Sequence, residues 1–186
     1  PYKTGEYKKA CGSNIPNETI LIDNKGVGNV VVSLHGEKLK KKTGEYVLDQ
    51  KKCKYEPHVL VMPVDSELKI YTSDPINHNI HTYSFDNDPI NIMFVPGQGA
   101  YSQEMEEAEV IKVECDLHNW MRAWVVVTPN SFSAVSGNDG SFEILDVPPG
   151  KYKLIAWHET LGSLTKNITV ENNELNINFE FLEVWF

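Results

Sequence analysis

The residues with the clearest chemistry lie in one short segment that holds Cys115, His118 and Met121. Their thiolate, imidazole and thioether are the soft and borderline ligands that copper prefers. A trigonal site of two His and one Cys with a distant axial Met is typical of electron-transfer copper centres. The second imidazole must come from elsewhere, and His78, on a turn after the strand-like run of residues 68–72, is the obvious source. For the loop alone, the alternative is a buried free Cys beside a surface His.

The stretch from about Tyr55 to Thr128 resembles the cupredoxins, the blue copper family of plastocyanin and amicyanin. The resemblance rests on Tyr55-Glu-Pro57, an apolar run and the pair His78-Asn79, which follow the order of the family's first half. Residues 110–121 follow its last strand and ligand loop. Two residues separate Cys115 from His118, and two separate His118 from Met121. This is the short loop of the amicyanin type.

The resemblance implies a ligand set and its surroundings. His78, Cys115 and His118 would be the strong ligands, and Met121 the axial one. Asn79 would hydrogen-bond to the loop that contains Cys115, which fixes ligand orientation and tunes the potential. The ring edge of His118 would be the exposed path for the electron. Trp120 would cover the metal from water, face a partner or close the local core.

Two further histidines are candidates for an extra or replacement ligand. The cupredoxin resemblance places His58 at the start of a strand near the metal end. There it would bind the metal, control the access of solvent to the metal, or lie on the surface without a role. His81 lies three residues after His78. Because side chains alternate along a strand, the two point to opposite faces, so binding by one argues against binding by the other.

Composition predicts an all-β protein. Val, Ile, Tyr and Thr recur in short alternating runs separated by turn residues, and no stretch has a sustained helical period. The apolar runs are too short to span a membrane. A formal net charge of -9 argues against binding to nucleic acid and to anionic lipid.

The two remaining cysteines, Cys11 and Cys53, form an even pair in polar surroundings. Two unrelated free thiols are the alternative to a disulfide. A disulfide would place the protein in an oxidising compartment outside the cytoplasm. The chain begins Pro1-Tyr2 without an apolar leader, which fits a processed start. We therefore expect a bacterial periplasmic protein whose signal peptide has been removed.

The C-terminal part resembles a second family. Residues 139–142 and 147–154 resemble the carboxypeptidase regulatory-like domain, a small transthyretin-like β-sandwich; we also expect strands at 141–144 and 175–181. The strand–turn–strand unit that opens that family matches residues 21–34, far upstream. The resemblance thus implies a cupredoxin Greek-key β-sandwich, residues 37–130, inserted in a discontinuous sandwich of residues 1–36 and 131–186. Two domains in tandem are the alternative.

Three functions follow as hypotheses. The first is a type 1 copper electron carrier between extracytoplasmic redox partners, such as cytochromes or a respiratory or oxidase complex. The second is a red-copper, nitrosocyanin-like protein with an open copper position for a small molecule such as nitric oxide. The third is a docking module with a structural metal. The apolar end Val184-Trp185-Phe186 packs on its own sandwich or joins a second subunit.

Overall fold

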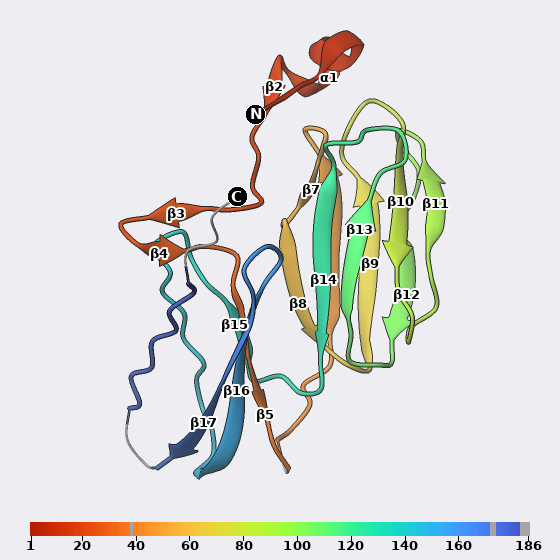
Figure 1. Ribbon diagram of the computed structural model, residues 1–186. Coiled ribbons are helices and arrows are strands. Elements are labelled where there is room, and N and C mark those ends of the chain that lie inside the picture. The colour runs from red at the N-terminus through yellow and green to blue at the C-terminus, as the bar shows by residue number, and fades with distance from the viewer. Residues whose placement is uncertain (38, 172–173, 183–186) are drawn as a thin grey trace.

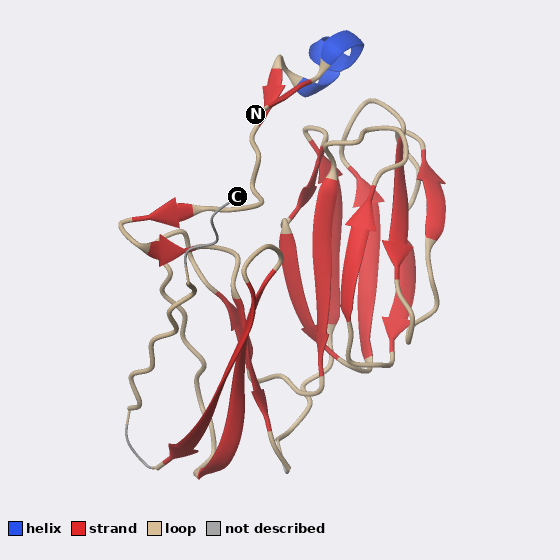
Figure 2. Cartoon of the chain, in the orientation of Figure 1, coloured by secondary structure: helices blue, strands red, loops and turns tan. Residues whose placement is uncertain are grey.

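The computed structural model describes residues 1–186 except 38, 172–173 and 183–186. The described chain is all-β apart from two short helical turns near the N-terminus, as Figure 2 shows. None of its helices is long and apolar enough to cross a membrane. The apolar segment 184–186 lies outside the described residues, so the subunit contact expected there stays a prediction.

The larger part of the fold is a sandwich of two sheets, which lie face to face in Figure 1. One sheet has the order β11-β10-β13-β14-β8. Its strands are β8 Val59–Pro63, β10 His78–Tyr83, β11 Asn91–Phe94, β13 Val110–Glu114 and β14 Arg122–Thr128. The other has the order β12-β9-β6-β7. Its strands are β6 Glu45–Lys51, β7 Lys54–Glu56, β9 Ser66–Thr72 and β12 Tyr101–Met105.

Alternating apolar side chains close this sandwich. Along β9, Leu68 and Ile70 are buried while Glu67 is exposed, which is the period of a strand with one face in the core. Ile80 of β10 and Ile111 of β13 meet them from the opposite sheet. The result is a closed apolar core between two sheets, which holds the ends of β10, β13 and β14 in fixed positions.

A third sheet joins residues from the two ends of the sequence. Its order is β15-β5-β16-β17, with β5 Val31–His35, β15 Ser133–Val135, β16 Gly150–His158 and β17 Gly162–Val170. All strands of the larger sandwich fall between β5 and β15 in sequence. β5 nevertheless pairs with both β15 and β16. The division into an inserted domain and a discontinuous one stays our interpretation of this topology.

Two segments expected as strands are extended but unpaired. Residues 141–145 and 174–182 have no strand hydrogen bonds, although Phe142, Ile144, Ile177 and Phe179 pack half-buried against the third sheet. The alternation of apolar residues predicted the buried face correctly. It could not predict pairing, because side-chain alternation does not specify a backbone partner.

Within the predicted strand–turn–strand unit of residues 21–34, a short hairpin joins β3 Ile22–Asp23 to β4 Gly26–Val27. Its two turn residues, Asn24 and Lys25, have φ of 47° and 73°, as a type I′ turn requires. A Cβ on Gly26 would lie 1.8 Å from the carbonyl oxygen of Asp139. Glycine is therefore needed where the hairpin meets the 137–141 turn.

The first residues form an arm that packs on the larger sandwich. The arm comprises β1 Tyr2–Lys3, a 3-10 turn Gly5–Tyr7, α1 Lys8–Cys11 and β2 Asn14–Ile15. Figure 1 shows it above one end of the sandwich. Cys11 and Ile15 belong to the larger core, and the predicted disulfide joins Cys11 to Cys53. Residues 2–15 thus lie with the larger sandwich rather than with the smaller one to which the sequence assigned them, because the disulfide ties them there.

Candidate metal centre

Strand ends position the candidate ligands. His78 is the first residue of β10, Cys115 directly follows β13, and Met121 directly precedes β14. β13 and β14 pair with Glu114 opposite Arg122, so the loop between them is a tight connection. Cys115 N–H donates to Met121 C=O at 3.2 Å, and Met121 N–H donates to His118 C=O at 2.9 Å. These bonds turn the loop back on itself and bring His118 over Cys115.

Three buried donor atoms converge at this end of the sandwich. The Nδ1 atoms of His78 and His118 are 3.1 Å apart, and Cys115 Sγ lies 3.7 Å from His118 Nδ1. Ligand atoms of all three residues lie within 4.8 Å of one another. Met121, with 1% of its surface exposed, is buried at the end of the same loop. The structure therefore brings together the three predicted strong ligands, with the predicted axial residue at the end of their loop.

Asp74 orients His78, and sequence reasoning did not find it. Its carboxylate lies 2.8 Å from His78 Nε2 and accepts the backbone N–H groups of Lys52 and Cys53 at 2.6 and 2.7 Å. When a metal is bound, a proton on Nε2 facing the carboxylate would leave the lone pair of Nδ1 for the ion. Burial alone would raise the pKa of Asp74, but these hydrogen bonds hold it below its usual range. The only signal in the sequence was an acid four residues before a candidate ligand.

Cys53 lies near His78 and Asp74, but its sulfur is in a disulfide and is no thiolate ligand. Burial alone would lower the pKa of His78, and hydrogen bonds to Asp74 and Cys115 raise it. The carboxylate of Asp74 thus acts on the imidazole from outside the donor cluster, as an outer partner does for a metal-bound histidine.

The surroundings of Cys115 favour its thiolate form. Burial would raise the pKa of its thiol, but hydrogen bonds from His118, His78 and the backbone N–H of Asn79 and Leu117 lower the pKa to about 6. The N–H of Asn79 lies 3.4 Å from the sulfur, and Asn79 Oδ1 accepts the N–H of Asp116 at 3.0 Å. Asn79 therefore makes the bond to the Cys115 loop that the resemblance implied.

The other two candidate histidines lie outside the donor cluster. His58 Nδ1 is 3.1 Å from Arg122 C=O, and its Nε2 pairs with the Glu159 carboxylate. His81 Nδ1 is 3.1 Å from Asp116 Oδ1, and its ring stacks on Tyr83. The side chain of His81 is one-third exposed while His78 is fully buried. The opposite directions of His78 and His81 follow from strand alternation.

The edge of His118 is covered, whereas the resemblance implied that it would be exposed. Only 1% of His118 is accessible. The ring of Tyr7 packs edge-on at 4.5 Å between centroids, and Trp120 lies at 5.1 Å. Trp120 Nε1 donates to Cys53 C=O at 3.1 Å, so Trp120 forms part of a lid. Sequence reasoning missed Tyr7, whose only signal was its nearness to Cys11.

The donor set fits copper. Two imidazole nitrogens, a thiolate and a nearby thioether are the ligands of an electron-transfer copper site, and a buried cluster of lone pairs around a thiolate is stabilised by a cation. His78, Cys115 and His118 would hold the ion, which would supply one-electron redox chemistry.

No protein-family model matches the chain, and no curated protein matches it. Among solved structures, the chain is similar to cupredoxins over about half its length. The reduced Cu(I) form of an amicyanin point mutant at pH 4 has 26% identity, covering 52% of this chain and 98% of that one, with a TM-score of 0.41. A purple cupredoxin from Nitrosopumilus maritimus has 22% identity over 46% of this chain and 99% of that one, with a TM-score of 0.38.

A third similar structure is a Cu-containing nitrite reductase from Thermus scotoductus SA-01. It has 15% identity and a TM-score of 0.41, and the match covers 50% of this chain but only 23% of the reductase. The chain thus corresponds to less than a quarter of that enzyme.

Proposed function

We propose that this protein binds one copper ion through His78, Cys115 and His118, with Met121 as the axial ligand, and exchanges single electrons. The observation that carries this proposal is the convergence of three buried donors within 4.8 Å. When bound, copper supplies the Cu(II)/Cu(I) couple, and this mixed set of soft and borderline ligands suits both oxidation states.

The protein's own residues keep the ligands in place. Asp74 fixes the tautomer of His78, and the N–H of Asn79 points at the sulfur of Cys115. All three strong ligands are buried, at 0, 4 and 1% exposure for His78, Cys115 and His118. A buried ligand set that is held by hydrogen bonds needs little rearrangement when an electron arrives or leaves, which suits an electron carrier.

The test is a redox titration of the copper-loaded protein, with matched histidine variants. Wild type should take up one copper per chain and show a reversible one-electron wave. His78→Ala should lose tight copper binding and the wave. His81→Ala should keep both, because His81 lies outside the cluster. If His81→Ala and His78→Ala behave alike, the assignment of ligands is wrong.

The red-copper alternative makes a different prediction in the same sample. An open position on copper would bind azide or nitric oxide and change the absorption spectrum. The lid of Tyr7 and Trp120 over His118 favours the closed, electron-carrying form, so we expect no change with either molecule.

The Cys11–Cys53 disulfide supports a place outside the cytoplasm, with the bacterial periplasm as our proposal. Secretion of a tagged full-length precursor, followed by fractionation of the cells, would test the compartment. A cytoplasmic, reduced protein would contradict it.

The sheet β15-β5-β16-β17, with the two extended segments that pack against it, supports our interpretation of this region as a carboxypeptidase regulatory-like sandwich.

A further inference from the structure

The arm closes the surface through which His118 would otherwise reach solvent. Tyr7 lies against the His118 ring, with ring planes at 83°, and contacts Trp120 at 6.1 Å between centroids. His118 Nε2 is buried and has no hydrogen-bond partner among the described residues. A partner approaching this end of the sandwich therefore meets the arm before it meets a ligand.

The arm is fixed in this place. Its disulfide joins it to Cys53, the residue whose carbonyl holds Trp120. Thr4 Oγ1 donates to Gly12 C=O within the arm, and Ile15 is buried in the larger core. Tyr7 is only partly buried, so one side of its ring contacts His118 while part of it stays accessible. Tyr7 thus links the donor cluster to the molecular surface.

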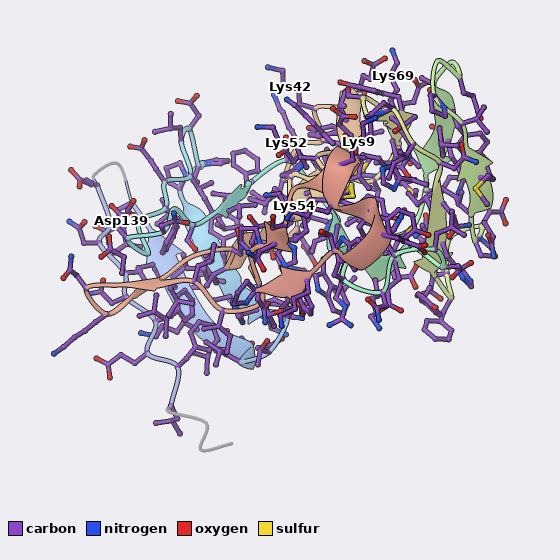
Figure 3. All side chains as sticks on the ribbon, turned by 90° about the horizontal axis from the view of Figure 1, so that it is seen from above. Lys9, Lys42, Lys52, Lys54, Lys69 and Asp139 are labelled. Atoms are coloured by element: carbon purple, nitrogen blue, oxygen red, sulfur yellow. A yellow bond between two sulfur atoms is a disulfide. The ribbon has the colours of Figure 1, made fainter. Side chains whose placement is uncertain are left out.

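Four exposed lysines lie on the arm or beside its disulfide partner Cys53, although the chain carries a net charge of -9. Lys3, Lys8, Lys9 and Lys52 are exposed and make no ion pair with any described residue. Lys54, by contrast, pairs with Glu18 at 2.9 Å. Figure 3 shows Lys9, Lys52 and Lys54 around the arm, seen from above.

Four acidic residues lie at the opposite end of the same sandwich. Glu104, Glu106, Glu107 and Glu109 lie at the end of β12 and in the turn before β13, whereas the ligand loop follows the far end of β13. Glu6 and Asp116 are also exposed near the metal end, where Asp116 pairs with His81, but the four unpaired lysines outnumber them there. Such a local excess of positive charge orients an approaching acidic protein before contact.

We propose that the arm surface, defined as Tyr7 with Lys3, Lys8, Lys9 and Lys52, docks an acidic one-electron redox protein. This inference rests on the proposed function, because a docking surface above the donor cluster serves electron exchange. The docked partner would exchange one electron with copper held by His78, Cys115 and His118; the reduced centre would lose the electron and the oxidised centre would gain it. No bond forms or breaks.

The first test measures binding without any electron transfer. The probe is hexacyanochromate(III), a redox-inert paramagnetic trianion that broadens the NMR signals of nearby amides. It is titrated into the full-length, metal-free protein and into the copper(I)-loaded protein. We expect broadening at Tyr7, Lys8, Lys9 and Lys52 in both forms. Broadening centred elsewhere would overturn the proposal.

A matched pair of variants separates local charge from net charge. Lys8→Glu/Lys9→Glu reverses two charges on the arm, and Lys151→Glu/Lys153→Glu reverses two exposed charges on β16 of the third sheet. The arm variant should lose the broadening and the sheet variant should keep it. An equal loss in both would show a general charge effect and would overturn the proposal.

The second test is kinetic. Ferrocyanide, an anionic one-electron reductant, should reduce the oxidised copper protein at a rate that falls with ionic strength despite the net negative charge. The arm variant should be slower by about 10-fold and the sheet variant by much less, as expected for local steering. A rate that rises with salt in wild type would contradict the proposal. Binding of the chromium probe by a protein that takes up no copper would instead reject the proposed function and leave the arm surface standing.

Discussion

The larger sandwich and the third sheet are built from similar strands but are closed in different ways. In the larger sandwich, two sheets cover each other, and Leu48, Leu68 and Ile70 are completely buried. The third sheet is covered by two extended segments whose apolar residues stay half-buried. A cavity of about 610 Å³ lies between this sheet and its cover, lined in part by Leu34, Phe142 and Leu154.

All the candidate ligands belong to the closed region. Donors must be held within a few tenths of an ångström to suit a metal, and side chains locked by a dense core provide this. The third sheet supplies none of His78, Cys115, His118 and Met121. It contacts the larger sandwich through valines of both regions and through the Trp124–Trp157 pair, whose centroids are 5.2 Å apart. Its open packing is compatible with a docking role and unsuited to holding a metal.

Removing the disulfide should have the largest effect and should act on one region alone. Cys11→Ser/Cys53→Ser removes a crosslink over a sequence separation of 42, which should lower the free energy of unfolding by about 4 kcal/mol in the chain-entropy model. Hydrogen exchange should show lost protection in the arm and β10, with β16 unchanged. Equal loss in β16 would mean that the two regions unfold as one unit.

Matched leucine truncations should sharpen the contrast in packing. Leu48 and Leu154 are exposed by 0 and 2%, but only Leu154 borders the large cavity. Leu48→Ala should cost about 3 kcal/mol and Leu154→Ala about 2 kcal/mol, because a loose site collapses around the lost atoms. Urea denaturation followed by circular dichroism measures both. A larger cost for Leu154→Ala would contradict the description of the third sheet as loosely packed.

The contact between the two regions should depend on pH. Burial would raise the pKa of Glu159, but hydrogen bonds from His58 and Trp124 hold it below its usual range. A carboxyl with a depressed pKa adds stability above its unfolded pKa of about 4.3, and this is lost as pH falls through the folded value.

Burial and the charge of His58 also lower the pKa of His158. The folded state therefore favours neutral His158, and the stability that this adds is lost as pH falls below about 6.5. Glu159→Gln should cost about 1–3 kcal/mol at pH 7 and flatten the acid side of the stability profile. Denaturation midpoints between neutral and acid pH would test this. An unchanged acid limb in the variant would exclude Glu159 as the group responsible.

The smallest effect is expected for Trp120→Phe. This change keeps an aromatic ring near His118 but removes the bond from Nε1 to Cys53 C=O. It should cost about 1 kcal/mol. Copper content and the redox wave should be unchanged, because Trp120 donates no ligand atom. Loss of copper in this variant would mean that the lid is needed to assemble the site.

Local patterns predicted the ligand loop and the all-β class, whereas the cupredoxin resemblance implied that His78 would complete the donor cluster. The spacing of Cys115, His118 and Met121 places them on one turn, and strand alternation separates His78 from His81. With Cys115 assigned to the metal, the cysteine count predicted a disulfide between Cys11 and Cys53. These features depend on residues close in sequence or on simple parity, and a single sequence contains both.

Contacts between segments that are far apart in the sequence could not be predicted from such local patterns. Nothing near Tyr7 indicates that its ring covers His118, and nothing near His58 indicates that it pairs with Glu159 rather than with a metal. The bonds from the N–H groups of Lys52 and Cys53 to Asp74 also depend on how two loops meet. Such contacts are fixed by tertiary packing, which one sequence does not encode in any local period.

The most direct test of the account is the absorption and electron paramagnetic resonance spectrum of the protein loaded with stoichiometric Cu(II). A trigonal site with the thiolate of Cys115 should give an intense sulfur-to-copper band and a mononuclear copper signal with small parallel hyperfine splitting. Cys115→Ser should abolish the band. A colourless wild-type protein that takes up no copper, or a band that survives in Cys115→Ser, would contradict the account.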